Sequence, residues 1–122
     1  MSFDWLDYYH LAKELHKAPQ DAHYRDARLR SSVSRAYYSV FCLAKGYLCE
    51  VEKVTVPPGP EAHAAVEAEF RSRDRVVSSS LQRLRKDRNA ADYNTVIEGL
   101  DSKAAKSMIQ AEAAITRLRA KR

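Results

Sequence analysis

Long apolar runs, glycine-rich motifs and clustered metal ligands are all missing from these 122 residues. Because no apolar run reaches about 18 residues, no segment predicts a membrane-spanning helix, and we expect no contact with a membrane. No P-loop, G-x-G-x-x-G or G-x-S-x-G motif occurs, so a nucleotide would have to bind without a glycine cradle. The two earliest histidines, His10 and His16, lack the H-x-x-x-H spacing of a zinc site. We therefore expect neither a metal ion nor another cofactor.

Cysteine is scarce as well, with only Cys42 and Cys49. They lie on the same predicted helix, too far apart along its axis to form a disulfide with each other. We expect both to be core thiols of a protein in a reducing compartment. The N-terminal sequence MSFDWLDYY is acidic and aromatic, unlike the basic start of a signal peptide. Together with the chain length, these features predict one cytoplasmic domain spanning residues 1–122.

Positive charge is in moderate excess, because 21 lysines and arginines outnumber 16 aspartates and glutamates for a net charge of +5. Such an excess permits an anionic partner such as RNA without proving one. Basic residues concentrate within residues 71–88, RSRDRVVSSSLQRLRKDR. An ordinary solvated helix face followed by a loop is the alternative explanation of this stretch, and both interpretations stay open.

The chain is organised around residues 27–49, ARLRSSVSRAYYSVFCLAKGYLC. Apolar residues recur there at the three-and-four spacing of a helix, at Val33, Ala36, Tyr37, Val40, Ala44, Tyr47 and Leu48. A second stripe follows the neighbouring face, at Arg35, Tyr38, Cys42 and Cys49. A helix with two such stripes is predicted to lie between other helices, with the charge of Arg35 inside. The residues predicted to face water are Ser32, Ser39 and Lys45.

The N-terminal half of the chain predicts one further helix, over residues 3–17, with an inward stripe at Trp5, Tyr8 or Tyr9, Ala12 and Leu15. Pro19 ends this helix. Asp21 is the expected N-cap of the central helix, which would begin near Ala22. After the central helix, residues 51–60 carry three prolines and a glycine, which force a loop.

The C-terminal half predicts three more helices. The first covers residues 60–77, with an inward side at Ala64, Ala65, Ala68 and Phe70. The serines at 78–80 are expected to break it, and one of them to cap a fourth helix that begins near Leu81 and ends at residues 91–94. The core positions of this fourth helix are Leu81, Leu84 and Ala91. The last helix covers residues 101–119 before a frayed tail, with Ala104, Ala105, Met108, Ile109, Ala111 or Glu112, Ile115 and Leu118 inward. The whole pattern predicts an all-α, up-and-down bundle of four to five helices with a long central helix.

A group of chemically useful side chains lies in residues 88–93, RNAADY. Arg88 can bind a phosphate through its planar fork. Asp92 is the expected partner of Arg35, because a buried arginine requires an anion and an isolated buried charge costs several kcal/mol. Tyr93 would then pack near a tyrosine of the central helix. The alternative is a structural cluster without chemistry, made of Arg35, Tyr37, Tyr38, Asp92 and Tyr93.

Three stretches combine into a recognisable pattern over nearly the whole chain. They are VSRAYYSVFCLAKGYL at residues 33–48, HAAV at residues 63–66 with Phe70, and Leu84 followed by RNAADY. Together they closely resemble the small stand-alone type of HEPN domain (higher eukaryotes and prokaryotes nucleotide-binding). The resemblance implies a homodimeric bundle of four or five helices. It also implies a minimal nucleotidyltransferase as an antitoxin partner.

Many HEPN domains are metal-independent RNases in which an arginine is followed, after four to six residues, by a histidine at the dimer interface. Histidine suits the base role because its pKa lies near neutrality, and arginine stabilises charge on the phosphate. Here Arg88 and Asn89 match the motif, but the positions of the histidine hold Tyr93, Asn94 and Thr95. None is a competent base near pH 7, since tyrosine ordinarily has a pKa of about 10.

His63 is the remaining candidate for the missing base, and a satisfied or exposed structural histidine is its alternative. The resemblance therefore predicts an RNA- or nucleotide-associated module with a degenerate RNase motif, which binds through Arg85, Arg88 and Asn89. Two other functions stay open. One is an endoribonuclease in which Tyr93 or His63 assists Arg88, and the other is a helical adaptor without chemistry.

Overall fold

Five α-helices make up the regular structure of the protein, and the computed structural model describes residues 2–17 and 19–122. No strand occurs within those two ranges. The predicted all-α class is therefore confirmed. The helices are α1 (Leu6–His16), α2 (Arg25–Glu50), α3 (Glu61–Arg73), α4 (Arg75–Tyr93) and α5 (Leu100–Ala120).

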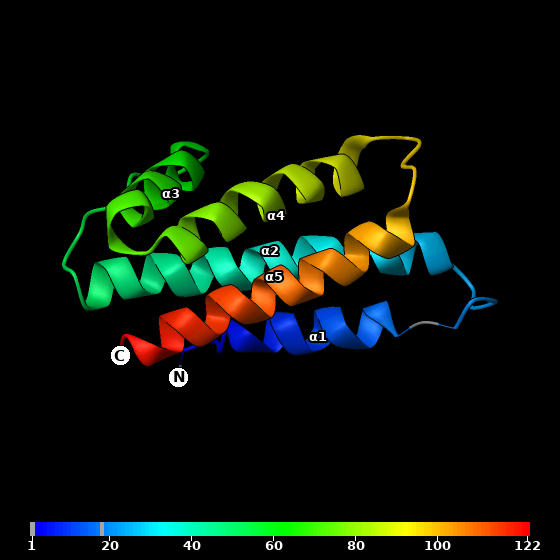
Figure 1. Ribbon diagram of the computed structural model, residues 1–122, viewed down its shortest axis with the longest axis horizontal. Helices are drawn as coiled ribbons and strands as arrows, with labels where there is room; N and C mark the ends of the chain where they lie inside the picture. The colour runs from blue at the N-terminus through cyan, green and yellow to red at the C-terminus, as the bar shows by residue number, and fades with distance from the viewer. Residues whose placement is uncertain (1, 18) are drawn as a thin grey trace.

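Four of the helices form an up-and-down bundle (Figure 1). The helices α1, α2, α4 and α5 run alternately in opposite directions along the molecule, and both chain ends lie at the same end of the bundle. The short α3 sits at that end, after the loop that leaves α2. None of the helices in the described part of the chain combines the length and apolar character needed to cross a membrane.

The long central helix is confirmed, since α2 packs against each of the other four helices. In the described part of the chain, however, α1 and α4 do not pack against each other. One side of α2 therefore stays open between them. The second stripe of α2 lies on this side and is only partly covered: Arg35, Tyr38 and Cys42 are half-buried and Cys49 is exposed. The predictions that Arg35 is buried and that Cys49 is a core thiol are wrong, because no helix covers this stripe.

Two serines of α2 were expected in water but are fully buried. The hydroxyl of Ser32 donates a hydrogen bond to the carbonyl oxygen of Ala12 at 2.7 Å, and that of Ser39 donates to the carbonyl oxygen of Trp5 at 2.9 Å. A small hydroxyl lets α1 approach α2 closely while its own polar atom remains satisfied. These serines therefore attach the start and the middle of α1 to the central helix.

The N-terminal boundaries differ from the predictions by a few residues. Helix α1 begins at Leu6, and Trp5 is 38% exposed, so this residue does not belong to the core. Helix α2 begins at Arg25 after Tyr24, whose φ of 57° is left-handed, and no side chain caps it. The prediction of an Asp21 cap near Ala22 is therefore wrong, because the chain turns sharply just before Arg25.

The break between the third and fourth helices falls at Asp74 rather than at the serines. The Asp74 carboxylate accepts hydrogen bonds from the backbone N–H groups of Val76 and Val77, at 3.0 and 3.4 Å. Aspartate is as good an N-cap as serine, and the chain provides it several residues earlier. The serines at 78–80 consequently lie inside α4, and the buried side of α3 consists of Ala62, Val66 and Phe70.

The C-terminal helix extends further than expected, to Ala120. Its end is anchored rather than frayed, because Lys121 pairs with Asp74 and Arg122 with Glu50, each at 2.9 Å. Ile109 was expected inward but is 68% exposed. The prediction is confirmed at Ala104, Met108, Ala111, Ile115 and Leu118, which are buried, whereas Ala105 is only half-buried.

Candidate functional site

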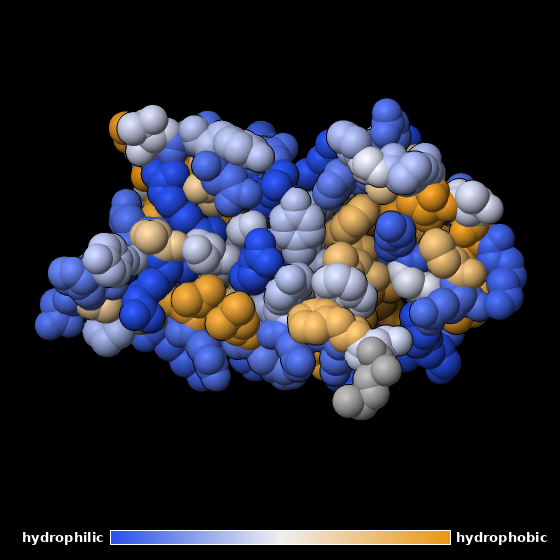
Figure 2. Space-filling view, turned by 180° about the vertical axis from the view of Figure 1, so that it is seen from behind, coloured by the Kyte–Doolittle hydropathy of each residue, from blue (hydrophilic) through white to orange (hydrophobic). Residues whose placement is uncertain are grey.

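The open side of α2 forms a groove of about 370 Å³ between α1 and α4. Figure 2 looks onto this side of the molecule, where orange and pale surface is interspersed with blue, hydrophilic side chains. Three helices and the residue before α1 supply its walls. The lining residues are Trp5, Tyr8, Ser34, Arg35, Tyr38, Cys42, Arg88 and Asp92.

Arginine and tyrosine side chains alternate across this groove. The guanidinium carbon of Arg35 lies 4.8 Å from the ring centre of Tyr8 and 5.4 Å from that of Tyr38. The guanidinium carbon of Arg88 lies 5.1 Å from the ring centre of Tyr38 and 5.7 Å from that of Tyr93. These are cation–π distances. The five residues, here called the Arg–Tyr ladder, connect α1, α2 and the end of α4.

The predicted ion pair between Arg35 and Asp92 does not form. Instead, Oδ2 of Asp92 lies 2.9 Å from Nε of Arg88, one helical turn earlier on α4. Within the described residues Arg35 has no ion pair. Because Arg35 is only half-buried and lies beside two tyrosine rings, its charge does not require a buried counter-ion. The two predicted partners nevertheless line the same groove.

Arg88 is held from several sides. Its Nη1 donates a hydrogen bond to Oδ1 of Asn89 at 2.9 Å, while Nε, although close to Asp92, makes no hydrogen bond of good geometry. Its side chain is 17% exposed. The guanidinium is therefore positioned in the groove with its charge only partly balanced by one carboxylate.

The C-terminal end of α4 is fixed by Arg30, a residue that the sequence patterns did not single out. Its guanidinium donates hydrogen bonds to the carbonyl oxygens of Ala91, Asn94 and Thr95, at 3.0, 2.5 and 3.0 Å. A cation at this position also stabilises the negative end of the helix dipole. No local signal marks Arg30, because the contact joins two helices distant in sequence. Tyr8 was also missed as a site residue, because the sequence offered Tyr8 or Tyr9 only for the inward stripe of the first helix.

Tyr93 lies at the rim of the groove, and 73% of it is exposed. The prediction that it packs against a tyrosine of α2 is wrong, since its aromatic neighbour is reached only through Arg88. Asn89 is exposed beside it and Arg85 is half-buried. The three residues predicted to bind RNA or a nucleotide, Arg85, Arg88 and Asn89, thus all lie in the C-terminal half of α4.

His63 lies on α3 and joins the cluster from the other side. Its Nδ1 is 2.5 Å from the hydroxyl oxygen of Tyr37, and its ring stacks on Phe41 with 4.4 Å between ring centres. The ring centre of Tyr38 is 6.3 Å away. His63 is therefore packed and hydrogen-bonded, as expected for a histidine with a structural role. Its ring nevertheless lies next to Tyr38 of the Arg–Tyr ladder.

The surroundings of His63 favour its neutral form. Burial lowers the pKa of its imidazole, and the charges of Arg85, Arg88 and Lys45 lower the pKa further. Burial likewise raises the pKa of Tyr37 above its ordinary value, so its hydroxyl keeps its proton. Two tautomers fit this contact: either the tyrosine donates to Nδ1, which places the imidazole proton on Nε2, or Nδ1 donates and Nε2 is free to accept.

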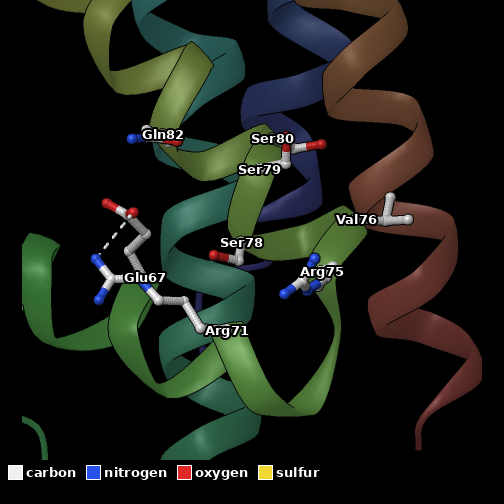
Figure 3. A pocket seen from close by; sticks show the side chains of 8 residues that line it. All are labelled: Glu67, Arg71, Arg75, Val76, Ser78, Ser79, Ser80 and Gln82. Atoms are coloured by element: carbon white, nitrogen blue, oxygen red, sulfur yellow. Dashed lines mark hydrogen bonds and ion pairs between the residues drawn. The ribbon is translucent and has the colours of Figure 1, made fainter.

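A second concavity, of about 670 Å³, lies where α3 meets α4. Figure 3 shows its side chains, and we refer to it as the α3–α4 pocket. Arg71 pairs at 3.5 Å with Glu67, whereas Arg75 has no ion pair within the described residues. The lining residues are Glu67, Arg71, Arg75, Val76, Ser78, Ser79, Ser80 and Gln82. In the described ranges, no three potential metal ligands come together.

No family model, curated protein or solved structure matches this chain. The function is therefore inferred from the residues of the groove and their geometry.

Proposed function

We propose that the protein is a module of HEPN type that binds RNA or a nucleotide in the groove beside α2. The observation that carries this proposal is the Arg–Tyr ladder, which sets two guanidinium groups into one groove with only one carboxylate. Planar guanidinium groups match the oxygens of a phosphate. Tyrosine and tryptophan rings at the same groove give a base a surface on which to stack.

The ladder also prepares the site for a ligand. Arginine side chains lose considerable conformational freedom when they are ordered, and both ladder arginines are already held against aromatic rings. A bound phosphate would compete with Asp92 for Arg88, which favours moderate affinity. Arg35 carries no such competitor within the described residues and is therefore the stronger anchor.

A second candidate function, a metal-independent endoribonuclease, is favoured by the position of His63. Proton abstraction requires a neutral base near a phosphate-binding arginine, and burial together with Arg85, Arg88 and Lys45 lowers the pKa of His63. The hydrogen bond with Tyr37 opposes this role whenever Nε2 carries the proton. Incubation of RNA with the protein in a chelator tests it: cleavage that is lost in both His63→Gln and Arg88→Gln supports the enzyme. No cleavage by the wild type contradicts it.

Binding is tested by titrating a fluorescent single-stranded oligoribonucleotide into the wild type, Arg35→Gln and Arg88→Gln. We expect each substitution to weaken binding roughly tenfold, and the dependence on salt to become less steep. Arg119→Gln is the matched control, because it removes the same charge from the exposed end of α5. Equal affinity of all four proteins would contradict the proposal.

The partners implied by the resemblance belong to the same proposal. The protein would form a homodimer and would associate with a nucleotidyltransferase antitoxin. Light scattering on the purified protein tests the first part. A mass equal to one chain of 13.9 kDa at all accessible concentrations would contradict it.

A further inference from the structure

One face of α4 is free of acidic side chains along its whole length. Its exposed residues recur at alternating intervals of four and three, which places them on a single face of the helix. We call them the outer stripe: Arg75, Ser79, Gln82, Lys86, Asn89 and Tyr93. The carboxylates of the helix lie elsewhere, at Asp87 and at Asp92, and Asp92 is paired with Arg88.

The outer stripe connects the two concave regions of the molecule. At its first end, Arg75, Ser79 and Gln82 line the α3–α4 pocket. Figure 3 shows Arg75 and Gln82 on α4, with Arg71 on α3 extending toward Glu67. At its other end, Tyr93 contacts Arg88 of the groove. The distance between the ends is about 27 Å, from the rise of an α-helix over this length.

We propose that the α3–α4 pocket, the outer stripe and the groove form one continuous track for single-stranded RNA. Phosphates along the strand would contact Arg75 and Lys86, and a base would stack on the exposed ring of Tyr93. Glu67 weakens the contribution of Arg71, because the two side chains pair within the pocket. This inference rests on the proposed function and specifies its ligand as a strand longer than a mononucleotide.

The chemistry of the stripe favours RNA over a protein partner. Protein interfaces need an apolar centre, and Val76 is the one large apolar side chain lining the pocket among the described residues, at 41% exposure. A double helix would contact the cations but would leave the ring of Tyr93 without a base face. A flexible single strand satisfies both kinds of side chain.

The test compares the affinities of a nucleoside monophosphate and of oligoribonucleotides of two, four and eight nucleotides. We expect affinity to rise with length. In the Arg75→Gln/Lys86→Gln variant the octamer should bind about tenfold more weakly and with a shallower salt dependence, while the monophosphate is unaffected. Both substituted residues are exposed, so folding should be preserved. Lys106→Gln/Arg119→Gln on α5 is the matched control for charge.

The outcomes separate the track from the groove. The track is overturned if the octamer binds no more tightly than the monophosphate, or if its affinity is the same in the wild type and in the double variant. In either case, monophosphate binding that weakens in Arg88→Gln still supports the groove. Octamer binding that is weakened in the double variant but not in Arg88→Gln overturns the groove and also the continuous track, because the track includes the groove. Displacement of the octamer by an equally charged acidic peptide at equal concentration overturns the assignment to RNA.

Discussion

Arg88 of α4 and Tyr38 of α2 face each other in the groove, with the guanidinium carbon 5.1 Å from the ring centre. This contact takes the place of the ion pair that the sequence predicts between α2 and α4. Arg88 also pairs with Asp92, whereas Arg35 of α2 lies against two tyrosine rings and has no ion pair among the described residues. The central helix therefore presents positive charge to its open side, which gives the groove its chemistry.

The first prediction concerns Asp92, which competes with any bound phosphate for Arg88. We expect Asp92→Asn to tighten RNA binding roughly two- to threefold, in line with an i,i+4 ion pair of ~0.5 kcal/mol. The free energy of unfolding should change by less than about 1 kcal/mol, because the carboxylate is partly exposed. Fluorescence titration and urea unfolding measure the two effects. If Asp92→Asn lowered the free energy of unfolding by several kcal/mol, this result would contradict the prediction and would support a buried ion pair between Asp92 and Arg35.

A second prediction concerns Asp74, the buried carboxylate that caps α4 and pairs with Arg117 and Lys121 of the C-terminal segment. We expect Asp74→Ala to lower the free energy of unfolding by about 3 kcal/mol, because it removes a cap and leaves two cations without their partner. Urea unfolding is the measurement. The matched control is Asp101→Ala, which breaks an exposed pair with Arg25 and should cost less than about 1 kcal/mol. Equal effects of the two substitutions would contradict this role.

The third prediction is that the free energy of unfolding decreases at low pH because of Asp74. Burial alone would raise the pKa of its carboxyl, but hydrogen bonds from Arg117, Lys121 and the backbone of Val77 lower it to about 2, from an ordinary 3.8. The folded state thus binds this proton less readily than the unfolded state. The resulting stability, up to about 2 kcal/mol, is complete above about pH 4 and is lost as the pH falls toward 2.

The measurement is urea unfolding of the wild type and of Asp74→Asn across this pH range. The asparagine can still accept the capping hydrogen bonds, so the two proteins differ mainly in the charge. Their difference in the free energy of unfolding should shrink as the pH falls from about 4 to about 2. A difference that stays constant over this range would show that the charge of Asp74 contributes nothing.

His63 provides a prediction at milder pH. Its pKa is lowered from the ordinary 6.5 by burial and by Arg85, Arg88 and Lys45. The neutral form therefore favours folding, and this contribution is complete above about pH 6.5 and is lost as the pH falls through the lower pKa of the folded state. An NMR titration of the imidazole, assigned with His63→Gln, measures that pKa directly. A pKa above 6.5 would contradict the described surroundings of the ring.

The bundle was predictable because apolar periodicity alone determines it, as the buried positions of α2 and α5 illustrate. Helix boundaries were less predictable, because serine and aspartate compete as caps and only the assembled fold decides between them. Asp74 prevails over the serines at 78–80 because Arg117 and Lys121 of α5 compensate its charge. These partners lie more than forty residues away and leave no local signal.

The sequence predicted several of the residues that line the candidate site, but it did not predict how they contact one another. The sequence identifies Arg35, Tyr38, Arg88 and Asp92, and all four line one groove. It does not reveal that α1 and α4 stand apart, and this separation exposes Arg35 and removes its need for Asp92. The burial of Ser32 and Ser39 was missed for a related reason, since their acceptors are carbonyl groups of the segment containing α1.

The most direct test observes the side-chain Nε–Hε signals of Arg35 and Arg88 by NMR while a nucleoside monophosphate is added. Arg35→Lys and Arg88→Lys assign the two signals. The account predicts that both shift together and saturate at one ligand concentration, because both guanidinium groups bind the same ligand in one groove. Signals that stay in place while those of other arginines shift would contradict it.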